Sequence, residues 1–476
     1  MGGLNAKKII TDIRFWIIIF FIIRLLGITN PPLETAHNWR QTTVTMVSRN
    51  FCEVDNNIFY PRIDMAGNKT GITGMEFPLL NYLIYLVSSA FGYQHWYGRL
   101  INLIISSLGL WFFYKLVRKN FSEQISFYST IILAVSIWFA YSRKIMPDTF
   151  AVSLILASIY YGTCYFEVKS WLKKIIYLFC YTVLLVLGGL SKLPAACLLI
   201  VFAVFIFNRQ IAVREKLIFI LASFSGLIPI IYWYFVWVPY LVKEYGFLHF
   251  FMGKSLTVGA NEIIANLPKT FEKFYDTALK FIGFAFFLLG LIFSIIKKDK
   301  KVVIIFCLTF FTFCVIIIKS GFAFPHHDYY IIPFVPVMAL VAAYGLVQIK
   351  NPKIVLIVLI AISVEGIASQ QHDFRIQKEN LTLINLEQDL DKFSNRNDLI
   401  IINSGDYPTP MYFSHRKGWV NTNEMIENQT YINELIDNGL KYIVILKKRF
   451  GAETALNHYK KEFENEDYCI YKMSKL

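Results

Sequence analysis

The sequence predicts an all-α membrane-spanning domain followed by a small α/β domain, and three observations support this fold class. Hydrophobic residues make up 56% of the 476 residues, which is far more apolar than a typical water-soluble domain. The apolar residues form continuous runs, as in membrane helices, and do not alternate as in a β-barrel. The basic residues behind the net charge of +14 lie in short clusters between these runs. That arrangement follows the positive-inside rule, so the charge does not indicate a nucleic-acid partner.

We expect eleven membrane-spanning helices, because eleven apolar runs are long enough to cross about 30 Å of hydrocarbon. They lie near residues 15–29, 99–117, 122–141, 149–166, 174–190, 193–208, 217–239, 278–296, 302–318, 329–348 and 354–370. With a cytoplasmic N-terminus, every short basic loop falls on the cytoplasmic side. The sequence therefore predicts a multi-pass protein of the plasma (inner) membrane whose long loops and C-terminal tail lie outside the cytoplasm.

The first outer loop, residues 30–98, is counted here with the membrane domain, residues 1–370. Residues 78–92 of this loop are apolar but form a short run. Counting them as a span would move every later basic cluster to the outside. We therefore expect an interfacial or re-entrant helix at this place.

The tail, residues 371–476, contains more charged residues and shorter apolar runs than the rest of the chain. Strand-like runs occur at 399–403, 442–446 and 468–473, with helical patterns at 421–438 and 452–463. The tail is therefore predicted to be a small soluble α/β domain outside the cytoplasm.

Two carboxylates of the first outer loop are candidate catalytic bases. Glu34 follows the first span in the string PPLETAHNWRQ, and partial desolvation there would raise its pKa toward the working pH. Glu76 lies where the chain re-enters apolar surroundings, where an idle charge is costly. Ordinary surface exposure of Glu34 and helix capping by Glu76 are the alternatives. His37 and Arg40, in the same string as Glu34, are candidate substrate-binding residues.

Basic groups on the outer side break the positive-inside pattern at two turns. Arg143 and Asp148 lie in the turn SRKIMPD, and Lys192 lies in the two-residue turn of SKLP. A cation at the membrane surface suits a lipid phosphate. Snorkelling is the alternative for Lys192, interfacial anchoring for Arg143 and a helix start for Asp148. Asp148 is also a candidate catalytic base.

The string PHHDYY at the start of the tenth span holds His326, His327, Tyr329 and Tyr330. Metal binding is the less favoured interpretation, because adjacent histidines seldom face one ion and no further ligand has a recognisable spacing. Hydrogen bonds to a phosphate are preferred. The sequence has no Walker loop, GxSxG, HExxH or dinucleotide motif, which argues against ATP-driven transport. We expect no cofactor and no metal.

Taken in order, these strings resemble the type C glycosyltransferases, in the bacterial branch near protein O-mannosyltransferases and the lipid A aminoarabinose transferase. The strings are PPLETAHNWRQ, EFPLLNYL, FGYQHWYGRL, SRKIMPD, LSKLPA and HHDYYIIPFVP. The resemblance implies a carboxylate base in the first outer loop, a polyprenyl-phosphate sugar donor and a reaction on the extracytoplasmic face.

The resemblance also implies roles for individual residues. Glu34 matches the first-loop acid, Arg143 and Asp148 match an arginine and an aspartate of the turn between the third and fourth spans, and Lys192 matches a phosphate-binding lysine. His327 and Tyr329 fall in a segment that approaches the carrier phosphate in relatives. The sequence departs from the aminoarabinose transferase pattern of adjacent acids, because Thr35 follows Glu34. Glu76 and Asp148 therefore stay as alternative bases.

The predicted function is transfer of a sugar from a polyprenyl-phosphate carrier to an acceptor hydroxyl, with inversion at the anomeric carbon. The acceptor is a glycan, a lipid or a protein, and the lipid bilayer is the surrounding medium. A transporter or flippase of lipid-linked sugars is the main alternative, and a surface-glycan polymerase or ligase is another. A transporter would need polar groups at the bilayer midplane, whereas the apolar runs here contain few charges, of which Arg24 is the plainest.

Overall fold

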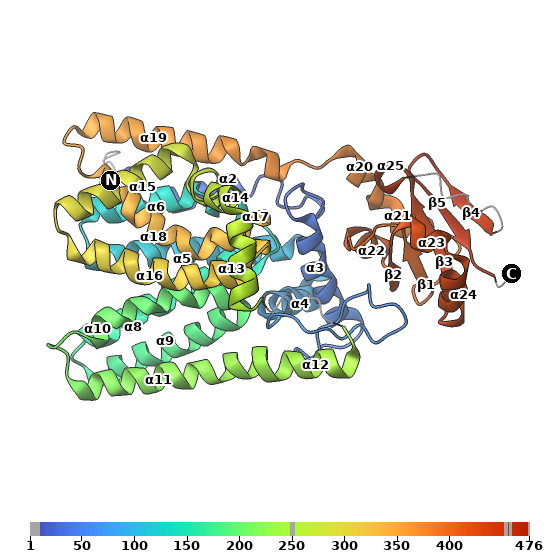
Figure 1. The fold of residues 1–476 in the computed structure, drawn as a ribbon, viewed down its shortest axis with the longest axis horizontal. Coiled ribbons are helices and arrows are strands. Elements are labelled where there is room, and N and C mark those ends of the chain that lie inside the picture. The colour runs from blue at the N-terminus through green and yellow to red at the C-terminus, as the bar shows by residue number, and fades with distance from the viewer. Residues whose placement is uncertain (1–9, 248–252, 452–455, 457–458, 475–476) are drawn as a thin grey trace, which may run out of the picture. The chain divides into compact units, whose positions relative to one another are not determined.

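The computed structural model describes residues 10–247, 253–451, 456 and 459–474. Contacts between Cα atoms divide the chain into two compact units. Unit 1 comprises Met1–Ile28, Arg99–Val236 and Phe251–Gln371, and unit 2 comprises Thr29–Gly98, Trp237–Phe250 and His372–Leu476. Figure 1 shows the elements of both units along the chain.

Unit 1 is built from helices alone in its described part (Figure 1). They are α2 (Ile13–Arg24), α5 (Tyr97–Asn120), α6 (Glu123–Val135), α7 (Trp138–Tyr141), α8 (Pro147–Glu167), α9 (Trp171–Ser191), η1 (Leu193–Phe202), α10 (Ala203–Ile206), α11 (Val213–Tyr232), η2 (Trp233–Trp237), α13 (Leu256–Ala265), α14 (Leu267–Glu272), η3 (Lys273–Ala278), α15 (Lys280–Ile296), α16 (Lys300–Ser320), α17 (Ala323–His326), η4 (Asp328–Phe334), α18 (Val335–Leu346) and α19 (Pro352–Ser369).

Seven helical segments among the described residues are long and apolar enough to cross a membrane. The bent pair Leu267–Ala278 and Lys280–Ile296, with 100° between its parts, makes an eighth if it is one span. Helices occupy all eleven predicted positions, but the first is the 12-residue α2 and the sixth is mostly a 3-10 helix. The chain is therefore an integral membrane protein. The count of eleven spans and the orientation stay predictions, and residues 1–9 at the N-terminus lie outside the described part.

Glycine lets two of these helices pack closely. A Cβ atom at Gly290 of α15 would collide with the carbonyl oxygen of Val341 in α18, and a Cβ at Gly345 of α18 would collide with that of Phe286. Close backbone approach at small residues is a usual means of packing helices in a membrane, where hydrophobic burial drives association weakly. The two glycines therefore allow the backbones of α15 and α18 to approach closely.

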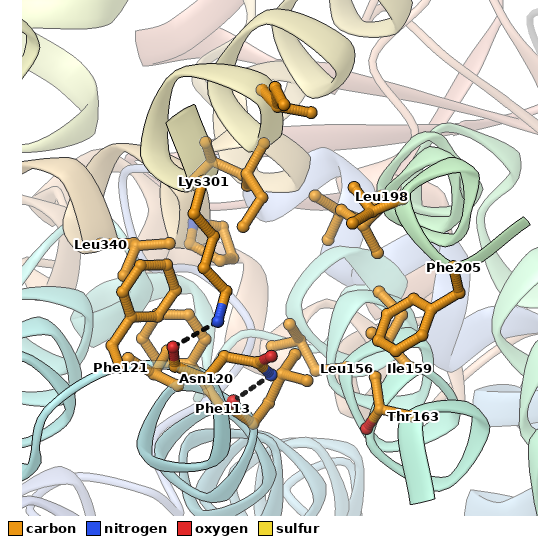
Figure 2. A pocket seen from close by; sticks show the side chains of 18 residues that line it. Phe113, Asn120, Phe121, Leu156, Ile159, Thr163, Leu198, Phe205, Lys301 and Leu340 are labelled. Carbon is orange, nitrogen blue, oxygen red and sulfur yellow. Dashed lines mark hydrogen bonds between the residues drawn. The ribbon is translucent and has the colours of Figure 1, made fainter. Parts of the chain in front are cut away.

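An apolar cavity of about 150 Å³ lies among α5, α8, η1, α16 and α18. Figure 2 shows its wall of aliphatic and aromatic side chains, with Lys301 and Asn120 among the few polar ones. The ammonium of Lys301 donates a 2.5 Å hydrogen bond to the carbonyl oxygen of Asn120. The cavity therefore offers a hydrocarbon environment.

Unit 2 combines helices with one sheet (Figure 1). Its elements are α3 (Asn38–Glu53), α4 (Leu79–Phe91), α12 (Val238–Tyr245), η5 (Gln371–Phe374), α20 (Lys378–Leu381), η6 (Thr382–Asn385), α21 (Leu386–Leu390), β1 (Leu399–Ile402), α22 (Thr409–Ser414), β2 (Gly418–Val420), α23 (Asn423–Glu427), α24 (Gln429–Asp437), β3 (Leu440–Leu446), α25 (Lys447–Phe450), β4 (Lys460–Glu464) and β5 (Tyr468–Lys472).

The sheet of unit 2 has the strand order β2-β1-β3-β5-β4. Strand β1 pairs in parallel with β2 and β3, whereas β5 is antiparallel to β3 and β4. The three predicted strands form β1, β3 and β5, and the predicted helical pattern at 421–438 forms α23 and α24. The tail is thus α/β, as expected.

The predicted helix at 452–463 is wrong at its C-terminal end, where Lys460–Glu464 forms strand β4. The sequence KKEFE favours a helix locally, but pairing with the buried β5 overrides that preference. Residues 452–455 and 457–458 of the predicted helix lie outside the described part of the chain. Strand β2 was not predicted because its three residues are too few for a recognisable pattern.

The first outer loop shares a hydrophobic core with the tail. This core includes Leu33, Met46 and Ile63 from the loop, and Leu386 and Ile400 from the tail, all essentially inaccessible to solvent. Thr29–Gly98 therefore belongs to the same compact unit as the tail. From the sequence, this loop was counted with the membrane domain, residues 1–370. The helix expected at 78–92 is present as α4, whose 13 residues are too few to span a bilayer.

Candidate functional site

A buried cluster in unit 1 joins Asp148, Lys192 and Tyr329. The ammonium nitrogen of Lys192 lies 3.6 Å from Oδ1 of Asp148 and 5.3 Å from the ring centre of Tyr329. The side chain of Lys192 is 11% exposed and that of Asp148 is 4% exposed. The three residues lie at or beside the starts of α8, η1 and η4. A cation held in this way is available for charge-assisted contacts with an anion.

Local sequence explains why Asp148 is at this place. Pro147 occupies the first position of α8 and Asp148 its first turn, where a carboxylate interacts favourably with the helix dipole. Its Oδ2 atom is buried and has no hydrogen-bond partner among the described residues. One carboxylate oxygen thus faces Lys192 at ion-pair distance, and the other can still accept a hydrogen bond.

The turn that carries Arg143 is fixed by Asn102 of α5. The amide nitrogen of Asn102 donates hydrogen bonds to the carbonyl oxygens of Tyr141, Lys144 and Met146, at 2.8–3.2 Å. Lys144 itself is fully buried. Neither Asn102 nor Lys144 was a candidate from the sequence. The one feature that could have pointed to Asn102 is an amide side chain within an apolar run.

Arg143 is held by backbone carbonyl groups. Its guanidinium donates to the carbonyl oxygen of Leu26 and, at 3.1 Å, to that of Gly27. These carbonyls directly follow α2, where the helix leaves acceptors unsatisfied. Arg143 therefore fixes the chain beyond α2 against the turn that precedes Asp148.

The two adjacent histidines have different surroundings. The ring of His327 stacks on Tyr329 with 5.4 Å between ring centres, and burial lowers the pKa of His327 below its usual value. The ring of His326 stacks on Phe322 at 3.9 Å. Tyr330 lies 4.8 Å from Tyr329. The structure therefore brings His327, with Tyr329, to the Lys192 cluster, whereas His326 packs on Phe322.

Glu34 in unit 2 is completely buried. Its backbone forms an isolated antiparallel bridge with Ile376, and the amide of Thr35 donates to the carbonyl oxygen of Arg375 at 2.8 Å. The loop after α2 is thus tied to the chain just before the tail domain. The carboxylate predicted as the general base is therefore buried and carried by a backbone segment that is held in place.

Arg40 and Glu76 form a buried ion pair within unit 2. The sequence analysis assigned the first to substrate binding and the second to catalysis, and it did not predict their contact. His37 precedes α3 with a left-handed φ of 56°, and its ring lies 6.3 Å from that of Trp39. Arg40 and Glu76 thus stabilise the first outer loop through each other.

The predicted site residues therefore form two sets, one in each unit. Asp148, Lys192, His327 and Tyr329 lie together in unit 1, to which Arg143, His326 and Tyr330 also belong. Glu34, His37, Arg40 and Glu76 belong to unit 2. In the described part of the chain, no three His, Cys, Asp or Glu side chains lie close enough together to hold a metal ion.

Part of the sequence matches a known family, and the fold is similar to that of solved structures. Residues 76–234, one third of the chain, match the family model described as dolichyl-phosphate-mannose-protein mannosyltransferase. ArnT from Cupriavidus metallidurans, solved in the apo state, superposes with a TM-score of 0.61 at 11% identity, over 96% of this chain and 97% of that one. ArnT bound to undecaprenyl phosphate gives 0.60 at 11% identity, over 96% and 98%.

An archaeal oligosaccharyltransferase, AglB from Archaeoglobus fulgidus, solved with an inhibitory peptide and a dolichol-phosphate, gives a TM-score of 0.59 at 11% identity. The match covers 91% of this chain and 69% of that one. No curated protein matches the chain in sequence.

The fold is that of the type C membrane glycosyltransferases. The resemblance to this superfamily found in the sequence is thereby confirmed.

Proposed function

We propose that this protein is a membrane glycosyltransferase that takes a sugar from a polyprenyl-phosphate carrier and transfers it to an acceptor hydroxyl on the extracytoplasmic face. The observation that carries the proposal is the buried cation of Lys192 between Asp148 and Tyr329. A buried cation with a single carboxylate at 3.6 Å can exchange part of that contact for a phosphate oxygen. Phosphate-bearing lipids are bound in structures of the similar fold, by ArnT and AglB.

The apolar cavity of Figure 2 supports a lipid as donor. Its walls include Leu156 of α8, Leu198 of η1 and Leu340 of α18. Asp148 and Lys192 lie at the starts of α8 and η1, and η4 with Tyr329 leads directly into α18. A phosphate at Lys192 would thus have hydrocarbon-lined space further along the same elements, where an isoprenoid chain is solvated better than a nucleotide.

The roles in the reaction follow from charge. Lys192 neutralises the leaving carrier phosphate, with Arg143 fixing the neighbouring turn, and His327 and Tyr329 donate hydrogen bonds to it. Glu34 accepts the proton of the acceptor hydroxyl as the new glycosidic bond forms. Attack opposite the phosphate inverts the anomeric carbon. The carrier phosphate bond supplies the driving force, and protein cations serve in place of a divalent ion.

The test is transfer by the purified protein from a radiolabelled polyprenyl-phosphate sugar to a membrane extract of glycans, lipids and proteins. We expect label in an acceptor fraction with the wild type and none with Glu34→Gln or Lys192→Ala. A flippase would instead move the labelled lipid across vesicles and leave the sugar attached to the carrier. Label transfer that persists in both variants would refute the assigned residues.

A further inference from the structure

Helix α3 is attached to the tail at points along its whole length. The helix begins at Asn38, four residues after Glu34, and ends at Glu53. The contacts, in order along the helix, are Thr35 with the Arg375 carbonyl (2.8 Å), Asn38 with the Tyr407 hydroxyl (2.6 Å), Thr42 with Thr409 (3.1 Å), Arg49 with the Tyr412 carbonyl (3.0 Å) and Glu53 with His415 (2.8 Å). The tail therefore determines where α3 lies within unit 2.

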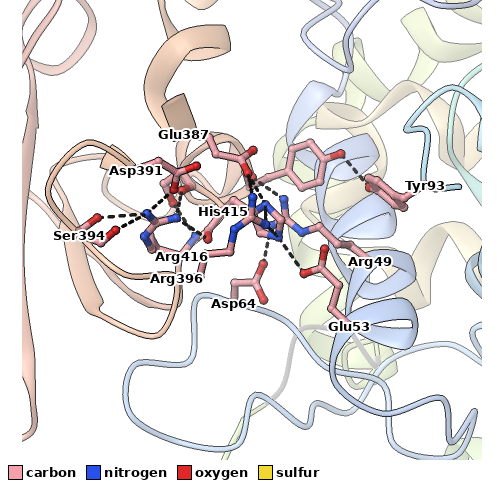
Figure 3. A network of polar contacts seen from close by, with 12 residues as sticks. Arg49, Glu53, Asp64, Tyr93, Glu387, Asp391, Ser394, Arg396, His415 and Arg416 are labelled. Carbon is pink, nitrogen blue, oxygen red and sulfur yellow. Dashed lines mark hydrogen bonds and ion pairs between the residues drawn. The ribbon is translucent and has the colours of Figure 1, made fainter. Parts of the chain in front are cut away.

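The attachment at the C-terminal end of α3 depends on one imidazole. Nε2 of His415 lies 2.8 Å from a carboxylate oxygen of Glu53 in α3, and Nδ1 lies 2.6 Å from one of Glu387 in α21. Figure 3 shows His415 between these two side chains. A carboxylate only accepts hydrogen bonds, so both ring nitrogens must carry protons to make both contacts. The two carboxylate contacts therefore favour the imidazolium form, whereas the 2.6 Å contact of Arg396 Nη1 with Nδ1 opposes it, because a guanidinium can only donate.

The charges that face His415 balance only in that form. Two other cations lie near it, Arg49 and Arg396, and three carboxylates are present, from Glu53, Asp64 and Glu387. Arg49 pairs with Asp64 at 2.9 Å, and Arg396 pairs with Glu387 at 2.7 Å while its Nη1 lies 2.6 and 3.0 Å from the two ring nitrogens. Protonated His415 supplies the third positive charge.

Two further groups complete the surroundings of the ring. Tyr412 of α22 accepts a hydrogen bond from the hydroxyl of Tyr93 or donates one to it, at 2.8 Å, and the Arg49 guanidinium lies 4.7 Å from the centre of its ring. Arg416 pairs with Asp391 at 2.6 Å, so these two charges cancel. Loss of the proton from His415 therefore leaves one carboxylate in excess.

His415 keeps its proton to a higher pH than an ordinary histidine does. Burial lowers the pKa of His415, but hydrogen bonds to Glu387 and Glu53 outweigh it, so the pKa is raised overall. The same contacts lower the pKa of Glu53 and Glu387 despite their burial. Because the pKa of His415 is higher in the folded protein than in the unfolded chain, its protonation stabilises the fold. This stabilisation is fully present at a pH below the unfolded pKa and is lost as the pH rises through the folded pKa.

We propose that protonated His415 is a positioning residue, which joins α21 and α22 of the tail to the end of α3 and so fixes the segment that begins with Glu34. All the residues that form the bridge belong to unit 2, so its charge and geometry do not depend on the proposed function. Only the consequence for sugar transfer rests on the proposed function. Deprotonation would release Glu53 from His415, loosen α3 at its C-terminal end and lower kcat with little change in KM for the carrier.

The experiment compares wild type, His415→Asn and His415→Lys by hydrogen exchange of the α3 amides, at about pH 5.5 and about pH 9, either side of the histidine titration. Asparagine suits the left-handed backbone of residue 415, φ 47°, but removes the charge. Lysine keeps a positive charge at both pH values. His372→Asn is the matched control, because His372 contacts Asp373 at 2.8 Å but is 66% exposed.

Relative to the control at the same pH, we expect α3 of the wild type to be protected at the lower pH and to exchange about tenfold faster or more at the higher one. His415→Asn should exchange fast at both pH values, and His415→Lys slowly at both. If α3 exchanges equally in wild type and His415→Asn at the lower pH, the proposal is wrong, whether or not any variant transfers sugar. If exchange behaves as expected but transfer is absent in all proteins, only the proposed function fails.

Discussion

The ammonium of Lys192 lies 3.6 Å from the carboxylate of Asp148, with both side chains buried at the ends of helices in unit 1. This contact has two consequences. Each charge compensates the other, which is needed where water is scarce. The Oδ2 atom of Asp148 has no hydrogen-bond partner among the described residues, so it can accept a hydrogen bond from a ligand.

Replacement of Lys192 by methionine should abolish transfer and also destabilise the protein. It removes the group assigned to the carrier phosphate, which should lower kcat by about 10²–10³-fold, as for loss of one charge-stabilising donor. It also leaves Asp148 as an uncompensated buried charge, which costs about 3–5 kcal/mol of unfolding free energy. Thermal unfolding in detergent and transfer assays measure the two effects.

The double variant Lys192→Met with Asp148→Asn separates these effects. It carries no buried charge at this place, so its unfolding temperature should return most of the way to the wild-type value while transfer stays lost. Recovery of transfer along with stability would mean that Lys192 serves only to neutralise Asp148.

Replacement of Glu34 by glutamine should reduce kcat by at least about 10²-fold, the usual contribution of a general base. The amide has nearly the same size, and the backbone contacts of Glu34 and Thr35 with Ile376 and Arg375 do not involve the side chain of residue 34. KM for the carrier should stay close to the wild-type value. Full kcat in this variant would move the base to Asp148 or Glu76.

The sequence identified Lys192 and Asp148 separately, because charges on the outer side of a positive-inside chain are exceptions that local reasoning can find. Their contact depends on how α9 packs beside α8, and on the close approach of Gly188 in α9 to Ile155 in α8. No local pattern encodes that packing. Asn102 was missed for the same reason, since its three acceptors lie in a distant turn.

Arg40 and Glu76 provide a test of whether Glu76 is structural or catalytic. Either single variant, Arg40→Met or Glu76→Gln, should destabilise unit 2 by about 3–5 kcal/mol, because it leaves one buried charge alone. The double variant should recover most of that stability. If the pair is structural, the double variant should also transfer sugar at a rate near that of the wild type. An inactive but stably folded double variant would assign Glu76 or Arg40 to the reaction.

The pair also shows where sequence reasoning fails in the first outer loop. Glu76 was recognised as a costly charge near the membrane, and Arg40 was assigned to substrate binding. A costly charge indicates function only if no partner compensates it, and here each residue is the partner of the other. The strands of the tail were easier to predict where apolar β-branched runs are long, as in β3, whereas β4 has a charged sequence and exists because β5 pairs with it.

Removal of divalent ions should leave transfer unchanged. The proposed reaction uses Lys192 as the positive charge at the leaving phosphate, and a bound ion is not required if protein cations neutralise that charge. Transfer rates measured with and without a chelator should agree within about twofold, a difference in barrier far smaller than the about 1.4 kcal/mol that changes a rate tenfold. A rate that falls on chelation and returns with Mg²⁺ or Mn²⁺ would show that a metal takes part.

Binding of the carrier tests the central claim most directly, because it needs neither the sugar nor the acceptor. Purified protein should bind undecaprenyl phosphate and should bind undecaprenol, which has the same chain without the phosphate, at least about tenfold more weakly. The Lys192→Met/Asp148→Asn variant should lose that preference, whereas Lys353→Met, an exposed lysine of α19, should keep it. Equal affinity of the wild type for the two lipids, or an unchanged preference in the double variant, would contradict a phosphate site at Lys192.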